Sequence, residues 1–148
     1  MAARDIAPRV RRSLPTLAEY RALAELRYQL RAFVSFSERA AREASLEPQH
    51  HQLLLAIKGL PEQLRPTIGT LAQRLCVEHH TTVALVDKLV AAQLVKRLPS
   101  ERDRREVLLE ITAEGEQRLA DLSTLHKAQL RTIGPALLAA LHSVLDEK

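Results

Sequence analysis

The 148-residue sequence predicts a mainly α-helical fold with one small β-hairpin. Leu (27) and Ala (21) together make up about a third of the chain, whereas Gly occurs four times, and this balance favours helices over a β-sandwich or barrel. Apolar residues recur at steps of three and four along most of the chain, as on one face of an amphipathic helix. In residues 107–111 the pattern changes to a period of two, with Val107, Leu109 and Ile111 alternating with Leu108 and Glu110, which fits a half-buried strand.

The chain begins with a basic segment, residues 1–15, which we interpret as a tail. It contains four arginines against one aspartate, and Pro8 and Pro15 interrupt it. A solvated terminus and an arm that touches DNA or a partner both fit this composition.

A long helix is predicted to follow the tail. Thr16 and Glu19 have the spacing of a capping box, in which each side chain bonds to the other residue's main-chain N–H. Apolar residues then recur at helical spacing, and neither Gly nor Pro occurs before about Ala44. A helix this long in a small domain needs another helical surface to pack on, and a second copy of the chain would supply one.

Three shorter helices are predicted next. Pro48 suits the first turn of one helix, which Gly59 ends. Thr67 is suited to cap the second helix. The third spans about residues 78–92, and one face of its helical wheel carries Thr82, Val83, Val86, Leu89 and Val90.

A hairpin and two more helices complete the predicted order. Residues 94–98 and 106–111 are rich in strand-forming residues and flank a charged loop. Thr112 is suited to cap the following helix, and Gly134-Pro135 is expected to break or kink it before a final amphipathic helix.

The second and third short helices, joined by a tight turn near residues 75–78, have the order of a helix-turn-helix unit. Such units place their second helix in the major groove of DNA. The residues expected to contact DNA lie at the start and on the outer face of this helix: His79, His80, Thr81, Ala84 and Lys88. An ordinary amphipathic helix with a solvated face is the alternative interpretation.

The charged loop of the hairpin indicates a second DNA contact. Residues 96–105 carry a net charge of +3, and long cationic side chains on a loop suit the negative potential of a narrow minor groove. We expect Lys96 and Arg97 to contact phosphates, and Asp103 to orient an arginine by accepting hydrogen bonds from its guanidinium group. A solvated turn is the alternative. The candidate residues in the loop are Arg102, Asp103, Arg104 and Arg105.

The region 67–119 resembles the winged helix-turn-helix of MarR-type transcriptional regulators. The most specific features are Asp103-Arg104-Arg105, the following Ile111-Thr112 and Glu114-Gly115, and the run LVDKL in the third short helix. The resemblance implies a homodimer formed by residues 16–45 and 116–148, with a DNA-binding region over residues 46–115. Each chain would place a recognition helix and a wing on half of a pseudo-palindromic operator, with Arg105 entering the minor groove.

The resemblance also implies a repressor that a small-molecule effector releases from DNA. His50 and His51 stand at the start of the first shorter helix, just after Pro48, where relatives form a pocket between the dimerisation and DNA-binding parts. A surface or capping role for both histidines is the alternative interpretation.

Other functional classes have little support in the sequence. The four glycines form no phosphate-binding motif, the six histidines lack His-x3-His spacing, and a single Cys provides no Cys-rich zinc site. We therefore expect no enzyme activity, no metal and no cofactor.

We also expect a cytoplasmic location with no membrane contact. A helical adaptor that keeps the hairpin but does not bind DNA is the remaining alternative.

Overall fold

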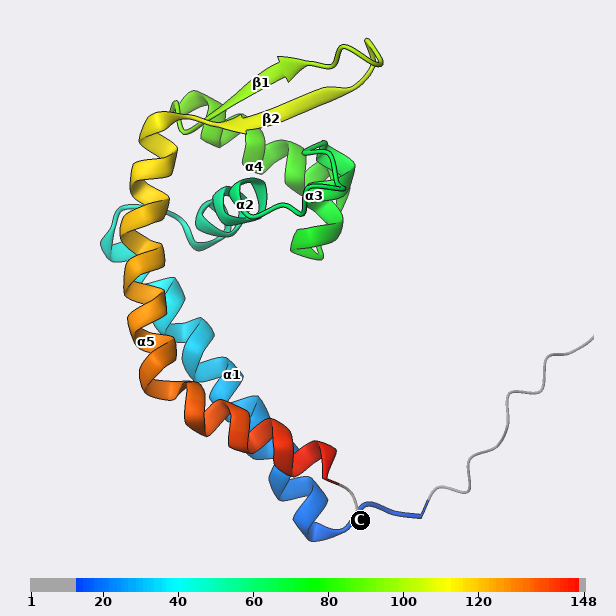
Figure 1. The fold of residues 1–148 in the computed structure, drawn as a ribbon, viewed down its shortest axis with the longest axis vertical. Helices are drawn as coiled ribbons and strands as arrows, with labels where there is room; N and C mark the ends of the chain where they lie inside the picture. The colour runs from blue at the N-terminus through cyan, green and yellow to red at the C-terminus, as the bar shows by residue number, and fades with distance from the viewer. Residues whose placement is uncertain (1–12, 147–148) are drawn as a thin grey trace, which may run out of the picture.

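The computed structural model describes residues 13–146, so most of the predicted basic tail lies outside the described residues. The elements follow the order drawn in Figure 1: α1 (Leu17–Glu43), α2 (Pro48–Lys58), α3 (Ile68–Leu75), α4 (His79–Ala91), β1 (Val95–Pro99), β2 (Val107–Ile111) and α5 (Ala113–Leu145). The predicted fold class, mainly helical with one hairpin, is confirmed.

Three helices, α1, α3 and α5, begin at the capping residues that the sequence predicts. Thr16 and Glu19 form the complete capping box at the start of α1. The Thr67 hydroxyl accepts a hydrogen bond from the Thr70 main-chain N–H at 3.2 Å, and Thr112 caps α5 in the same way through Gly115 at 3.1 Å. These side chains satisfy N–H groups that have no partner within the helix, so a local sequence signal fixes each helix start.

The molecule has two parts, an arm and a lobe. The arm consists of α1 and α5, which pack along each other, and the lobe contains α2, α3, α4 and the hairpin at one end of the arm (Figure 1). The lobe's core is aliphatic, and its fully buried side chains include Leu53, Leu54, Leu71, Val86 and Leu89. Within residues 13–146, no helix has the length and hydropathy needed to cross a membrane.

Gly134-Pro135 was expected to break or kink the helix, and the break is wrong, because α5 continues through Pro135 to Leu145 as one helix. The expected separate final helix is therefore the end of α5. Proline removes a single main-chain N–H donor, and its ring crowds the preceding turn. Figure 1 shows that α5 changes direction in its orange part, as expected of a helix that accommodates a proline by bending. α5 also packs along α1.

The hairpin is attached to the chain that precedes α3. β1 and β2 pair antiparallel, with Val95 opposite Ile111 and Pro99 opposite Val107. On the other side of β2, the Leu109 N–H donates to the Pro66 carbonyl at 2.9 Å, and Thr67 forms an isolated bridge with Leu108. The hairpin is therefore tied to the first helix of the helix-turn-helix.

Candidate nucleic-acid interface

The turn between α3 and α4 sets the direction of the predicted recognition helix. Cys76 ends α3 in the left-handed conformation (φ 55°), and the Val77 N–H closes the turn on the Ala72 carbonyl at 3.1 Å. The buried residues of α4 are Thr82, Leu85, Val86 and Leu89. The predicted inner face omitted Leu85, and Val83 and Val90, which it included, are only half-buried.

The outer face of α4 lies on the surface, as predicted. His79, His80, Ala84 and Lys88 are exposed, and Thr81 is half-buried. The Glu78 side chain makes no capping hydrogen bond, so the first-turn N–H groups have no side-chain acceptor there. A helix start of this kind attracts anions, because the N–H groups and the helix dipole both favour negative charge.

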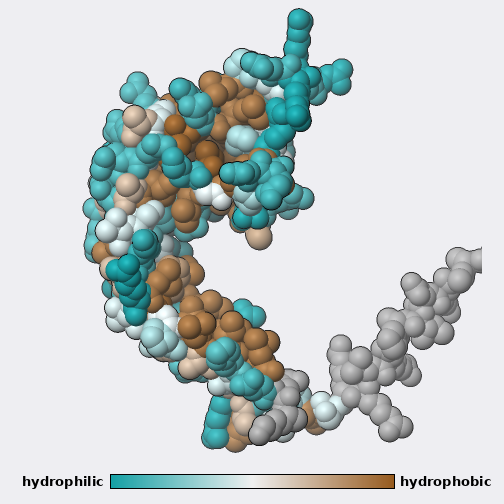
Figure 2. All heavy atoms as spheres, viewed as in Figure 1, coloured by the Kyte–Doolittle hydropathy of each residue, from teal (hydrophilic) through white to brown (hydrophobic). Residues whose placement is uncertain are grey.

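The loop between β1 and β2, the wing loop (residues 100–106), projects beyond the helices of the lobe (Figure 1). Arg102, Asp103, Arg104 and Arg105 are all exposed, and the hairpin tip is hydrophilic in Figure 2. Within residues 13–146, no ion pair engages the three arginines of this loop. Their charges are thus available to an external anion.

Asp103 bonds to the main chain of Arg105, whereas a bond to an arginine side chain was expected. Its carboxylate accepts a hydrogen bond from the Arg105 main-chain N–H at 2.9 Å, instead of from a guanidinium group. An aspartate readily bonds to the main chain two residues ahead in a tight turn. Asp103 therefore shapes the backbone from which the exposed Arg105 side chain extends.

Lys96 and Arg97, expected to contact phosphates, pair with carboxylates of this chain. The Lys96 amine lies 3.5 Å from Glu110, directly opposite it on β2. The Arg97 guanidinium pairs with Asp87 on the outer face of α4, which connects the hairpin to the recognition helix. Exposed ion pairs of this kind contribute little to stability, so a phosphate can compete for either cation.

The structure separates His50 from His51. His50 is half-buried, whereas His51 is 1% exposed, so a surface role for His51 is excluded. The His51 ring lies 4.8 Å from the ring of His126 on α5, and Phe33 and Phe36 of α1 contact His126 edge-on. Sequence reasoning missed this junction of three helices, because nothing in the local pattern pairs residues 75 positions apart.

Burial keeps the histidines of this junction neutral. Burial, with a smaller contribution from His126, lowers the pKa of His51 to about 4. Burial also lowers the pKa of His126, which a hydrogen bond to the Ser37 main chain partly offsets. The pKa of His50 is lowered first by burial and then by Lys88, against an opposing effect of Glu47. The Nε2 atoms of His51 and His126 have no hydrogen-bond partner within the described chain.

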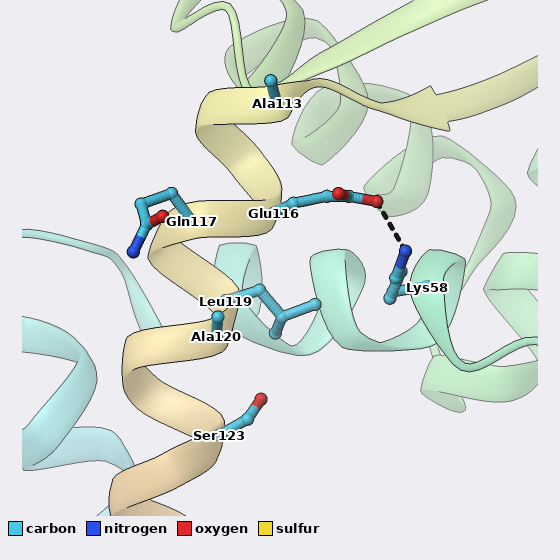
Figure 3. Close-up of a pocket in the computed structure, with 7 residues that line it drawn as sticks. All are labelled: Lys58, Ala113, Glu116, Gln117, Leu119, Ala120 and Ser123. Atoms are coloured by element: carbon cyan, nitrogen blue, oxygen red, sulfur yellow. Dashed lines mark hydrogen bonds and ion pairs between the residues drawn. The ribbon is translucent and has the colours of Figure 1, made fainter.

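A separate cavity of about 410 Å³ lies between the end of α2 and the first turns of α5 (Figure 3). Lys58 and Glu116 form an ion pair across it at 2.5 Å, and Leu119 points from α5 toward α2 (Figure 3). Neither His50 nor His51 lines this cavity. The structure therefore does not connect it with the effector pocket expected at the two histidines.

Comparison with known proteins identifies this fold. Residues 44–106 match the model of the MarR family. AbsC, a MarR family transcriptional regulator from Streptomyces coelicolor, superposes with a TM-score of 0.73 at 20% identity, over 91% of this chain and 94% of that one. No curated protein sequence matches the chain.

Two further solved structures share the architecture. The regulator BldR from Sulfolobus solfataricus has a TM-score of 0.64 at 24% identity, over 89% of this chain and 98% of that one. The M. tuberculosis regulator MOSR, solved in complex with DNA, has a TM-score of 0.57 at 24% identity, over 73% and 77% of the two chains. The predicted resemblance to the MarR family is confirmed, and the chain has the fold of its transcription regulators.

Proposed function

We propose that this chain, which has the fold of MarR family regulators, is a DNA-binding transcription regulator that acts as a homodimer. The observation that carries the proposal is an exposed wing loop with three arginines beside a helix-turn-helix whose outer face is polar. The hydrogen bond between Asp103 and the Arg105 main chain orders the loop beside the helix-turn-helix. This arrangement favours DNA binding over the alternative of a solvated turn. The solved complex of MOSR with DNA supports the same use of the fold.

In this proposal α4 enters the major groove and the wing loop follows the adjacent minor groove. His79, His80, Thr81 and Ala84 would meet base edges, and Lys88 would contact a phosphate. Arg105 would enter the minor groove, where the negative potential favours a guanidinium group. The remaining cations expected on the DNA backbone are Lys96, Arg97, Arg102 and Arg104.

Dimerisation would cover the apolar surface of the arm. Residues 16–45 and 116–148 are the proposed dimerisation region, and residues 46–115 the DNA-binding region. Figure 2 shows hydrophobic surface along the arm. The large apolar side chains left exposed there are Leu17, Tyr20, Leu23, Tyr28, Leu30 and Val34 on α1, and Leu125, Leu130, Leu138, Leu141 and Leu145 on α5.

Repression, and release by a small-molecule effector, complete the proposed function. A protein that covers an operator blocks transcription by occupying the DNA. The buried His51 lies where α2 of the lobe meets the arm, and His50 precedes it on α2. A ligand bound beside them would act on the angle between the two parts. Isolation of bound duplexes from a random-sequence pool tests DNA binding. If no duplex is enriched, the helical adaptor becomes the better interpretation.

Replacing Arg105 by alanine is expected to weaken binding to the selected duplex by at least about 1 kcal/mol, because a charged hydrogen-bonding group is lost. Lys58→Ala is the control for loss of a positive charge, since Lys58 ends α2, pairs with the exposed Glu116 and is not among the proposed DNA contacts. Gel-shift titration of both variants makes the comparison. An unchanged midpoint for Arg105→Ala would remove the wing from the proposed mechanism.

Sedimentation at micromolar concentration is expected to give twice the 16.6 kDa mass of the chain. Leu138 is 58% exposed on α5, and Leu138→Glu should weaken self-association by roughly tenfold, because a charge would enter the apolar contact. Leu64→Glu is the control, since Leu64 is similarly exposed but lies on the lobe. A monomeric mass for the unmodified chain would contradict the dimer.

A further inference from the structure

A hydrogen-bonded cluster of Arg65, Ser100 and Glu106 lies at the base of the wing loop, and the DNA contacts proposed above do not use it. Arg65 belongs to the segment between α2 and α3, whereas Ser100 and Glu106 are the first and last residues of the wing loop. The cluster therefore joins two segments that are far apart in the sequence.

The Arg65 guanidinium holds Glu106 with two hydrogen bonds. Its Nε donates to one carboxylate oxygen at 3.2 Å and its Nη2 to the other at 2.9 Å. The same Nη2 donates to the Ser100 hydroxyl at 2.9 Å, and that hydroxyl donates to Glu106 at 2.7 Å. Two-point arginine–carboxylate pairs are strong and fix orientation, because both groups are planar.

Ser100 extends the cluster to the backbone of the loop. Its hydroxyl oxygen accepts from the main-chain N–H groups of Arg102 and Asp103 at 3.2 and 3.4 Å. Ser100 is 8% exposed, and the side chains of Arg65 and Glu106 are 34% and 24% exposed. The cluster is thus more protected from solvent than the other ion pairs of the described chain.

The position of Arg65 is itself fixed relative to the helix-turn-helix. Its carbonyl accepts from the Thr67 N–H at 2.8 Å, and Thr67 caps α3. The neighbouring Pro66 carbonyl bonds to Leu109 of β2. A bond from Arg65 to the wing loop therefore fixes the position of the loop relative to the start of the helix-turn-helix.

We propose that Arg65, Ser100 and Glu106 are positioning residues that hold the wing loop in one orientation relative to α3 and α4. Arg105 and the recognition helix are then presented to DNA with a preset spacing. A loop that is ordered before binding loses less conformational entropy when it enters the groove, which raises affinity. This inference rests on the proposed DNA-binding function.

Direct contact of Arg65 with a phosphate is the competing role for this residue. Its charge is already matched by Glu106, and its Nε and Nη2 donors are directed to Glu106 and Ser100. The geometry thus favours positioning. The two roles predict different coupling to Arg105, since only a positioning residue acts through the wing loop.

The test is a double-mutant cycle on the duplex selected by the unmodified protein. Arg65→Gln and Glu106→Gln should each weaken binding by roughly tenfold, in the range of losing a charged hydrogen bond. In the Arg105→Ala background, Arg65→Gln should add a smaller loss, below about fivefold, because one of the loop arginines through which it acts is gone. Equal losses in both backgrounds would overturn the proposal.

Trypsin sensitivity provides a readout that needs no DNA. The wing loop contains Arg102, Arg104 and Arg105, and loosening it should speed cleavage after these residues several-fold in Arg65→Gln and Glu106→Gln. Lys58→Gln, which breaks the exposed Lys58–Glu116 pair outside the loop, is the control. Unchanged cleavage would refute the positioning role. If no duplex binds but cleavage rises, the proposed function fails and the cluster still holds the loop.

Discussion

Replacing Gly115 by alanine should lower the free energy of unfolding by about 3 kcal/mol, at the upper end of the usual cost of overpacking. A Cβ atom at this position would clash with the Leu94 carbonyl oxygen and would lie 2.8 Å from Cγ1 of Ile111. The first of these contacts is with backbone, so rotation of a side chain cannot relieve it.

Movement of the backbone is also costly there. The Leu94 carbonyl accepts a hydrogen bond from the Thr112 N–H at 3.0 Å, and the Thr112 hydroxyl donates to the Gln93 carbonyl at 2.7 Å. These bonds connect the start of α5 to the start of the hairpin. An added methyl group would have to stretch them or displace the helix.

Gly69→Ala is the matched control, because a Cβ at Gly69 meets nothing within 4 Å and both glycines lie in the first turn of a helix. Alanine at Gly69 should leave stability unchanged or raise it by up to about 1 kcal/mol, through its higher helix propensity. Urea unfolding followed by circular dichroism measures both variants. A stability loss for Gly115→Ala no larger than that for Gly69→Ala would contradict the close packing of α5 on the hairpin.

Lowering the pH from about 6.5 to 4 should remove about 3 kcal/mol of folding stability through His51 alone, since one pKa unit corresponds to about 1.4 kcal/mol. Burial holds the pKa of His51 at about 4 in the folded chain, below its ordinary value of 6.5. The unfolded chain therefore takes up a proton first as the pH falls. The contribution is fully present above pH 6.5 and is lost as the pH falls toward 4.

The test compares the pH dependence of unfolding in three proteins. His51→Leu removes the titrating group together with its buried Nε2 atom, which has no hydrogen-bond partner within the described chain. The folding stability of this variant should therefore fall less than that of the unmodified chain between pH 6.5 and 4. His142→Leu is the control, because His142 is exposed on α5. Parallel pH profiles for the unmodified chain and His51→Leu would show that His51 does not couple protons to folding.

The elements that sequence analysis predicted correctly depend on neighbouring residues. Thr16, Thr67 and Thr112 cap helices through bonds to N–H groups three residues ahead. β2 forms at the predicted residues 107–111, but its burial does not alternate as predicted, because Val107 is exposed and only Leu109 is fully buried. The outer face of α4 follows from helical geometry, so most of the candidate interface was predictable before the structure.

What the sequence alone left undecided depends on contacts between distant segments. By itself, the sequence determined the starts of α1, α3 and α5, the existence of the hairpin and the presence of arginines in the wing loop. These features follow from short-range geometry. Only the tertiary structure decided that α5 continues through Pro135, that His51 is buried against His126, and that Arg65 anchors the wing loop. In each case the energy comes from packing or ion pairing with a partner remote in sequence, which no local pattern specifies.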